Sequence, residues 1–201
     1  MTQRKKQPQI TRTALLDAAG EEFSRLGYVG TGLGSVVTRA GLTKGALFHH
    51  FPDKRSLALA WINEHLARSI TELWLTPLEN SDSLDALRLL CRLRVSELAP
   101  ADATSALSAL AAECTGPDDV LGSSLEHIFD AWRDALARLL ERGKTAGGIH
   151  RSIKPTAEAA FLVALIAGVT VTANSPRHAA TRRACLNSLE DYLDTLRNPA
   201  A

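Results

Sequence analysis

The sequence predicts an all-helical fold, with a small helix-turn-helix domain at the N-terminus and a larger helical body behind it. Two short apolar stripes flank Gly41 within residues 35–51. Beyond Thr76-Pro77, apolar residues keep recurring three and four positions apart, and no stretch alternates with the two-residue period of a strand. The chain has 201 residues and is 45% hydrophobic, which is enough for a small domain joined to a larger one.

The charge is unevenly distributed, although the net charge is only +1. Residues 1–60 hold nine Lys/Arg and four Asp/Glu, whereas the remainder holds fourteen and eighteen. A basic end joined to an acidic body is typical of a protein that meets a polyanion with one part only, although a basic solvated face is also common.

Cysteine usage and hydropathy indicate a cytoplasmic protein. Cys91, Cys114 and Cys185 are far apart and form no CxxC motif, which favours a reducing compartment over a disulfide framework. No apolar segment follows the basic residues near the N-terminus, so we expect no signal peptide. The most apolar run, residues 159–171, is too short for a membrane span, and we expect a buried interface helix there and no membrane contact.

The N-terminal residues predict a tail followed by a long helix. Residues 1–9 are polar and basic, so we expect a flexible arm that either follows DNA or merely keeps the chain soluble. From Ile10 to Leu26 the apolar residues keep helical spacing, and Gly27 ends the helix.

The glycine-rich segment 30–35 resembles a dinucleotide-binding loop, and Asp53 lies about where the ribose-binding acid would be. That fingerprint needs a strand before the loop, but a helix precedes it here, and Asp53 is better interpreted as a helix N-cap. We therefore expect Thr31 and Ser35 to flank the start of a second helix and to hold a phosphate.

Residues 35–51 predict the helix-turn-helix itself. Gly41 suits the left-handed position after a helix, and Thr43 is a good N-cap for the next one. Lys44 lies in the first turn of that second helix, where a side chain reaches phosphates or guanine edges. Gly45 and Ala46 are small enough for close approach. The alternative is an ordinary helical hairpin without a ligand.

The same region, with its flanks, resembles the TetR family of one-component transcriptional regulators. The resemblance covers about a quarter of the chain, and beyond Leu57 only the general layout of helices is similar. The matching residues are Arg12, Leu16, Ala18, Ala19, Phe23, Gly27, Tyr28, Val36, Ala40, Gly41, Thr43, Lys44, Gly45, Leu47, Phe51, Pro52, Lys54 and Leu57.

The resemblance implies about nine helices, three small and six larger, and a phosphate contact by Lys54. Phe48 replaces the tyrosine usual in the recognition helix, and His50 occupies another frequent tyrosine position, so Thr43, His49 and Lys54 would carry more of the backbone contacts. The expected DNA-binding residues are Thr31, Ser35, Thr43, Lys44, Gly45, Ala46, Phe48, His49, His50 and Lys54.

The remaining helices are predicted from their apolar stripes at residues 53–75, 82–98, 101–114, 118–145, 155–173 and 177–196. We expect four parts: an arm at 1–9, a DNA-binding domain at 10–53, an effector-binding and dimerisation domain at 54–197, and a tail at 198–201.

The last two helices predict a homodimer. The first of them is apolar nearly all round, as a helix buried on more than one side is. A pair from each subunit would form a four-helix interface, and paired recognition helices would then read a palindromic operator. A monomeric bundle is the alternative. The expected interface residues are Ala160, Ala164, Ala167, Gly168, Val171, Leu186, Leu189 and Leu193.

The resemblance implies a repressor that a small apolar or aromatic effector releases from DNA. The candidate pocket residues are Trp61, His65, Trp74, Leu87, Cys91, Leu110, Cys114, Phe129, Trp132, Phe161 and Leu165. Each of these taken singly is more often plain core than a ligand contact.

Two hypotheses from other classes stay open. The same scaffold could sense oxidants or electrophiles through Cys91 or Cys114, although cysteines in apolar helices are usually inert. An oxidoreductase built on the loop at residues 30–35 is the second. No catalytic constellation, metal-ligand spacing or P-loop is present in the sequence, so we expect no enzyme, no metal and no cofactor.

Overall fold

The computed structural model describes residues 3–96, 102–114, 120–173 and 175–199. Within these ranges the chain forms nine α-helices, counting residues 54–79 as one, and no strand, with a single isolated antiparallel bridge between Ile149 and Arg197. The all-helical prediction is confirmed.

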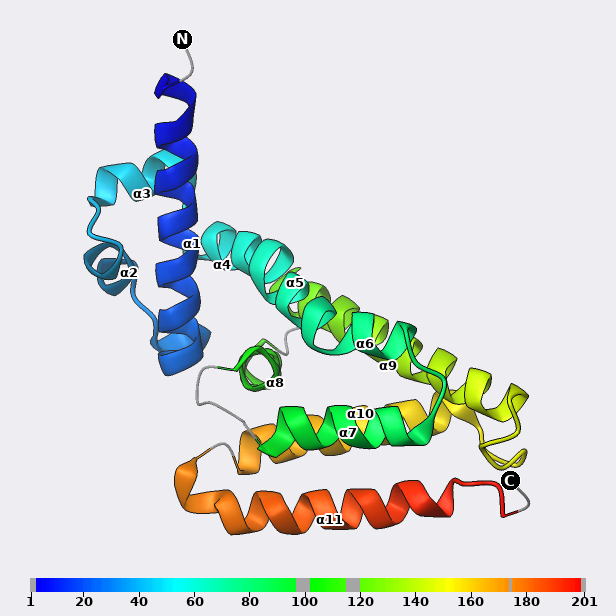
Figure 1. The fold of residues 1–201 in the computed structure, drawn as a ribbon. Coiled ribbons are helices and arrows are strands. Elements are labelled where there is room, and N and C mark those ends of the chain that lie inside the picture. The colour runs from blue at the N-terminus through cyan, green and yellow to red at the C-terminus, as the bar shows by residue number, and fades with distance from the viewer. Residues whose placement is uncertain (1–2, 97–101, 115–119, 174, 200–201) are drawn as a thin grey trace.

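The N-terminal unit consists of α1 (Gln3–Gly30), α2 (Leu33–Arg39) and α3 (Lys44–His50). In Figure 1, α2 and α3 lie on one side of the upright α1. Gly27 breaks the regular helix as expected, because it adopts φ 73° and ψ 175°. Three residues then complete the last turn of α1.

The first helix begins at Gln3, whereas an arm was expected over residues 1–9. Gln, Arg and Lys are good helix formers, and this composition is compatible with extending α1 towards the N-terminus. Residues 1–2 and the side chains of residues 3–7 lie outside the described part of the structure.

One long rod links the N-terminal unit to the body (Figure 1). It runs through α4 (Lys54–Trp61), the π-turn η1 (Ile62–Leu66), α5 (Ala67–Ile70), the π-turn η2 (Thr71–Leu75) and α6 (Thr76–Glu79). Its start is capped by Asp53, whose carboxylate accepts from Ser56 N–H at 2.7 Å. The rod continues past the expected end at Leu75, since η2 places a π-turn just before Pro77, which has no N–H to donate.

The rest of the body consists of α7 (Leu84–Ser96), α8 (Ala103–Glu113), α9 (Val120–Thr145), α10 (Pro155–Thr172), the 3₁₀ turn η3 (Pro176–His178) and α11 (Ala179–Thr195). In Figure 1, α8 is seen end-on beside the lower end of α1, below the rod and above α7. The helices α7, α10 and α11 form the lower part of the body. These bounds follow the expected ones closely within the described residues.

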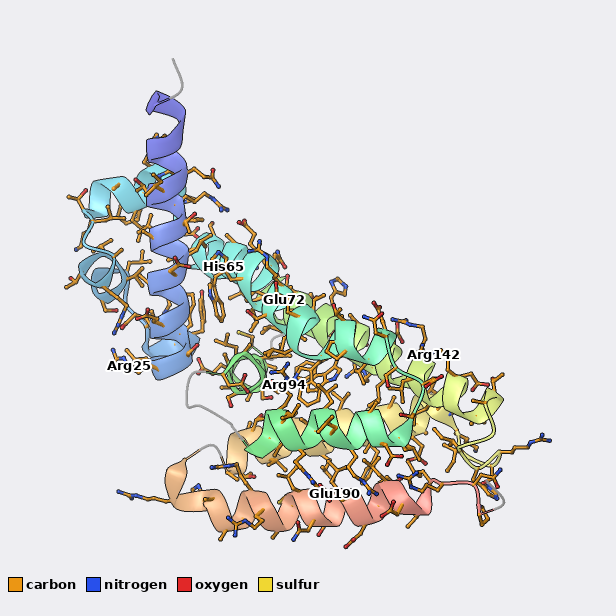
Figure 2. The ribbon with its side chains drawn as sticks, viewed as in Figure 1. Arg25, His65, Glu72, Arg94, Arg142 and Glu190 are labelled. Atoms are coloured by element: carbon orange, nitrogen blue, oxygen red, sulfur yellow. The ribbon has the colours of Figure 1, made fainter. Side chains whose placement is uncertain are left out.

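Polar contacts fasten the far end of the body. Arg142 of α9 donates to the carbonyl oxygens of Leu78, at 2.7 Å, and of Ser81, so it caps the end of α6 (Figure 2). Asn198 donates from its backbone to Gly148 O at 3.1 Å and from its side chain to Gly147 O at 2.9 Å. The segment expected as a tail from residue 198 therefore begins with a tethered residue.

A continuous hydrophobic core joins the two parts of the molecule. Trp61 of α4 packs on Phe23 of α1, with ring centroids 5.6 Å apart. Gly20 makes this approach possible, because a Cβ there would lie 2.3 Å from Trp61 Nε1. Any change in the angle between α1 and the rod must therefore disturb packed side chains.

Candidate DNA interface and effector region

The turn between α2 and α3 is built by two residues that the sequence singled out. Gly41 adopts φ +64°, which a residue with a Cβ rarely does. The hydroxyl oxygen of Thr43 accepts from Ala46 N–H at 3.2 Å and caps α3. Leu42 N–H donates to Val37 O at 2.9 Å and closes the corner. Both helix ends are thus satisfied locally, and the angle between the helices is fixed.

The outer face of α3 is open to solvent. Leu47 and Phe51 point into the core, while Lys44, Gly45 and His49 are exposed. The side chain of Phe48 is 52% exposed. The apolar spacing predicted that Leu47, Phe48 and Phe51 all face the core, which is confirmed for Leu47 and Phe51 and was wrong for Phe48.

The two histidines at the end of α3 form a pair, with ring centroids 5.1 Å apart and rings at 73°. Burial lowers the pKa of His50, and the charges of His49 and Arg12 lower it further. His50 is therefore biased towards its neutral form in the free protein.

A buried carboxylate that sequence reasoning missed holds α2 against α1. Glu22 is 1% exposed, and Arg39 Nε donates to its Oε1 at 2.7 Å, while Arg25 donates at 3.1 Å. The nearby Ser35 hydroxyl and then the Arg39 guanidinium lower the pKa of Glu22. Its position was a usable signal, since Glu22 falls between Ala19 and Phe23 on the apolar face of the helix.

Thr31 does not present its side chain to a ligand, contrary to the prediction. It is 2% exposed, and its hydroxyl donates to Gly27 O at 2.7 Å. The broken end of α1 leaves carbonyl oxygens without helical partners, and Thr31 satisfies one of them. Ser35 is half-buried and donates to Gly32 O at 2.8 Å.

Lys54 lies at the start of the rod, folded back against the end of α1. Its Nζ donates to Val29 O at 3.2 Å and lies 4.5 Å from the centroid of the Tyr28 ring. Burial lowers the pKa of Lys54, and the carboxylate of Glu113 partly opposes that shift. An ammonium carries three N–H donors, so the bond to Val29 leaves donors for a phosphate.

Much of the positive charge counted in the N-terminal sequence is used internally. Arg12 donates to Glu64 of η1, at 2.6 Å from Nη1. Arg25 pairs with Glu22, and Arg39 pairs with both Glu21 and Glu22. Lys44, by contrast, has no ion-pair partner among the described residues and is exposed. The charge count alone therefore overstated the cations available to a polyanion.

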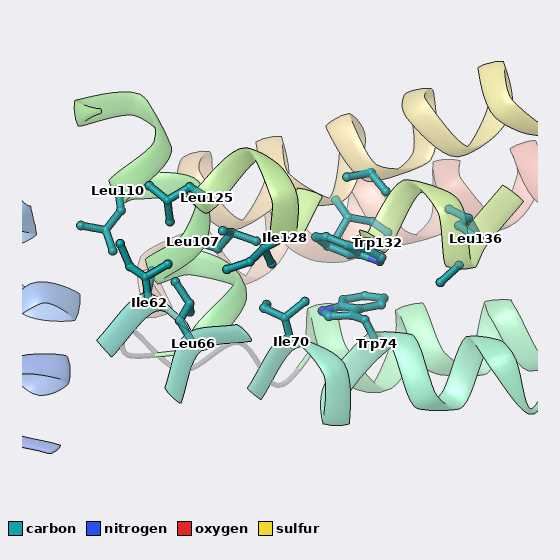
Figure 3. Packing of buried hydrophobic residues seen from close by; sticks show 14 of the residues in the cluster. Ile62, Leu66, Ile70, Trp74, Leu107, Leu110, Leu125, Ile128, Trp132 and Leu136 are labelled. Carbon is teal, nitrogen blue, oxygen red and sulfur yellow. The ribbon is translucent and has the colours of Figure 1, made fainter. Parts of the chain in front are cut away.

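The predicted pocket residues divide into separate groups. Trp74 and Trp132 lie against each other in the centre of the body, with ring centroids 4.6 Å apart and ring planes tilted by 38° (Figure 3). The ring of Phe129 is nearly parallel to that of Trp132, at 6.5 Å between centroids. Trp74 Nε1 donates to Thr104 Oγ1 at 3.0 Å. The indole N–H of Trp132 is buried without an acceptor in the described part of the chain. A buried donor left unpaired costs stability unless something bonds to it.

Trp61 and His65 belong to a different space. They line an open cleft of about 670 Å³ between α1, the rod and α8, together with Asp17, Glu21 and Glu72. Figure 2 labels His65 and Glu72 along the rod. The buried residues Cys91, Leu110 and Cys114 are parts of the core. Leu87 is buried as well, but it lines a second, apolar space of about 310 Å³ between α6, α7 and α9.

The side chain of Phe161 lies on the surface of the body, so its assignment to the pocket was wrong. It is 47% exposed and meets Tyr192 of α11 edge-on, with ring centroids 5.0 Å apart. Leu165, one turn along α10, is half-buried. Phe161 falls on the outward stripe of α10 because the inward stripe is occupied by residues such as Leu162 and Ile166.

The outward stripe of α10 is apolar and exposed. Val171 is 53% exposed, and the small members of the stripe, Ala160, Ala164 and Gly168, are exposed as well, whereas Ala167 is half-buried. Among the described helices, α10 alone is long and apolar enough to cross a membrane by length and composition, but its other side packs on α8 and α9 as a core helix does.

The leucines of α11 were wrongly assigned to a subunit interface. Leu186, Leu189 and Leu193 are 8%, 2% and 0% exposed, because α11 buries them against α7 of its own chain. Arg92 of α7 donates from Nη2 to the carboxylate of Glu190 of α11 at 2.7 Å and so joins the two helices. Figure 2 shows Glu190 on the side of α11 that faces α7. The periodicity identified a buried face but not its partner.

The three cysteines are free thiols, and none of them is fully exposed. Burial raises the pKa of Cys91 to about 12, which keeps the thiol protonated near neutral pH. Cys114 is buried, and Cys185 is half-buried. No group of three or more His, Cys, Asp and Glu side chains among the described residues is arranged to hold a metal ion.

Comparison with known proteins supports the interpretation of the N-terminal unit. Residues 15–61 match the family described as bacterial regulatory proteins, tetR family. The A-factor receptor protein of Streptomyces griseus is 28% identical over 172 residues, which cover 85% of this chain and 58% of that protein. The HTH-type transcriptional regulator RutR of Escherichia coli (strain K12) is 29% identical over 141 residues, covering 67% and 64%. The chain thus spans about three fifths of the length of these relatives.

A solved structure has the same fold over nearly the full length of the chain. The TetR transcriptional regulator from Chloroflexus aurantiacus J-10-FL superimposes with a TM-score of 0.81 at 23% identity, and the match covers 96% of this chain and 98% of that one. The comparison establishes the fold of the body but not what the body binds.

Proposed function

We propose, from the premise that this chain belongs to the TetR family of transcriptional regulators, that it is a homodimeric repressor released from a palindromic operator by a small apolar or aromatic effector. DNA binding through the helix-turn-helix and the absence of enzymatic activity follow from the family. The operator symmetry, the effector, the repression and the cytoplasmic location are our proposals.

The observation that carries the proposal is the exposed, capped face of α3. Lys44 and His49 project from it, and Gly45 leaves room for close approach to a base-pair edge. The Thr43 hydroxyl accepts the capping bond with its oxygen, so its own hydrogen remains available to a phosphate. We assign DNA contacts to Ser35, Thr43, Lys44, Gly45, Ala46, Phe48, His49, His50 and Lys54.

The dimer is supported by the outward stripe of α10. Exposed apolar residues in a continuous stripe are costly in water, and a second copy would cover them. Small residues at Ala160, Ala164 and Gly168 allow two such helices to approach closely. We assign residues 10–53 to DNA reading and 54–197 to dimerisation and effector binding, with the interface on α10 and the outer side of α11.

The effector site is supported by the aromatic centre of the body. Trp132 offers an unpaired N–H beside the rings of Trp74 and Phe129, which suits an aromatic or apolar molecule that carries one hydrogen-bond acceptor. One relative is a receptor by name, the A-factor receptor protein. The effector must prefer the spacing of the recognition helices that does not fit DNA.

Selection of duplexes from a random-centre pool, followed by mapping of binding sites on the source genome, tests this function. We expect the selected duplexes to contain inverted repeats and the affinity to fall steeply as salt rises. Asymmetric selected sites, or binding by a monomer, would contradict the proposal.

A further inference from the structure

Glu113, the last residue of α8, reaches from the body to the DNA-binding unit. Its Oε2 accepts a hydrogen bond from Val29 N–H at 2.8 Å, across 84 positions of sequence. A carboxylate in the last turn of a helix is repelled by the carbonyl end of the helix dipole. Glu113 therefore does not stabilise α8, and its favourable contact is the hydrogen bond with Val29 at the end of α1.

The approach of Glu113 depends on glycine at residue 27. Gly27 adopts φ 73°, and a Cβ built there would lie 1.9 Å from Oε1 of Glu113. Any other residue would be strained in this conformation and would also push the carboxylate away. The broken end of α1 is thus shaped to receive a side chain from the body.

Val29 is held from its other side by Lys54. The Lys54 Nζ donates to Val29 O at 3.2 Å. The negative charge of Glu113 raises the pKa of Lys54, against the larger lowering by burial. The Val29 side chain is 75% exposed, so backbone hydrogen bonds and not side-chain packing hold this residue. We call the contacts Glu113–Val29–Lys54 the interdomain latch.

We propose that Glu113 is a positioning residue for DNA binding, which holds the end of α1 and the Lys54 ammonium in place through the backbone of Val29. The inference rests on the proposed function in one respect, the phosphate contact of Lys54. Glu113 is the one charged residue of α8. At its other end, α8 is bonded to the centre of the body, because Thr104 Oγ1 accepts a hydrogen bond from Trp74 Nε1.

Two variants and a control test the latch in the full-length protein. Glu113→Ala removes the acceptor, whereas Glu113→Gln keeps an oxygen that accepts from Val29 N–H. Glu126→Ala is the matched control, because Glu126 is an exposed glutamate on α9. Duplex affinity is measured by gel shift on a sequence selected by the wild-type protein, and the Val29 amide is followed by NMR after labelling valine with ¹⁵N.

We expect Glu113→Ala to shift the Val29 amide signal and to weaken duplex binding about three- to tenfold, the range of one ordinary hydrogen bond. Glu113→Gln restores most of the affinity, and Glu126→Ala leaves both readouts unchanged. Gly27→Ala is expected to weaken binding by a larger factor in the wild-type background than in the Glu113→Ala background, because the clash with the carboxylate is then gone.

A Val29 signal or a duplex affinity unchanged in Glu113→Ala would overturn the proposal, as would a failure of Glu113→Gln to restore binding. The NMR readout needs no DNA. If the wild-type protein selected no duplex, the proposed function would fail, while the Val29 signal would still decide whether the latch exists.

Discussion

The face of α3 and the outward stripe of α10 are the two surfaces of this chain that we expect to meet partners, and they differ in character. The α3 face combines a cation, an exposed aromatic ring and small residues on a helix of seven residues. The α10 stripe extends from Ala160 to Val171 on a helix of 18 residues and is apolar. Polar readout needs a few well-placed groups, whereas association needs a large continuous area.

The two surfaces are also positioned by different means. Local bonds and backbone conformation at Gly41 and Thr43 orient α3, and the buried Glu22–Arg39 pair clamps α2 onto α1. Packing on α8 and α9 orients α10. Substitutions can therefore disable one surface and spare the other.

The largest expected effect is on association. Ala164→Glu places a carboxylate in the middle of the α10 stripe, and burying it without a partner should cost about 3–5 kcal/mol, raising the dimer dissociation constant at least about a hundredfold. Ala146→Glu, at an exposed alanine after α9, is the control. Sedimentation velocity that still shows dimers of Ala164→Glu at low concentration would remove α10 from the interface.

Substitutions on α3 should weaken DNA binding and leave dimerisation unchanged. We expect Lys44→Ala and His49→Ala each to abolish tight operator binding, at a cost of about 1–3 kcal/mol per lost contact, while the dimer stays intact. Gel shift and sedimentation on the same samples check both statements. Wild-type affinity in either variant would show that α3 does not enter the groove as proposed.

The backbone conformation at Gly41 can be tested separately from packing. A Cβ at Gly41 meets no atom within 4 Å, so Gly41→Ala introduces only the strain of φ +64°. We expect a loss of about 1 kcal/mol in the free energy of unfolding, measured by denaturant titration. A neutral result would mean that the turn relaxes to another conformation.

Acidification should affect the DNA surface in a defined direction. The pKa of His50 is lowered in the free protein by burial and by the charges of His49 and Arg12, so the fold favours the neutral ring. The contribution of this neutral ring to the stability of the folded protein is lost as the pH falls below 6.5, the ordinary pKa of histidine. Nearby phosphates favour the charged ring, so DNA binding should take up a proton. We expect affinity to rise about threefold from about pH 8 to about pH 6.

The corresponding variant is His50→Gln, which keeps a polar side chain without a titrating proton. Gel shifts over the same pH range should then lose most of the rise. An equal rise in His50→Gln would assign the proton uptake to another group.

The smallest expected effect concerns the cysteines. Since burial raises the pKa of Cys91 to about 12, Cys91→Ser should leave any effect of mild oxidants on DNA release unchanged. A response that disappears in this variant would restore the thiol-sensing hypothesis for Cys91, and Cys114→Ser tests the other buried thiol in the same way.

Local sequence signals predicted the N-terminal unit well. Gly27, Gly41, Thr43 and Asp53 act where the sequence placed them, because a positive φ and a side-chain cap involve residues only a few positions apart. Helix bounds in the body were also predictable from periodicity. The error at Thr31 arose because a hydroxyl near a helix start can turn either outward to a ligand or inward to a carbonyl.

Longer-range features could not be predicted. Periodicity marks a buried face but does not say what covers it, so Leu189 was assigned to a second subunit although α7 covers it. Phe161 was placed in the pocket for the same reason. The contact between Glu113 and Val29 joins positions 84 residues apart, and no sequence pattern links them.

Binding of the wild-type protein to an intact palindrome and to a single half-site, measured by gel shift over a series of salt concentrations, tests the central claim most directly. If α3 enters the major groove twice per symmetric dimer, the intact palindrome binds far more tightly, as one dimer, and its affinity falls steeply with salt. Equal affinity for the two duplexes, with little dependence on salt, would contradict the account.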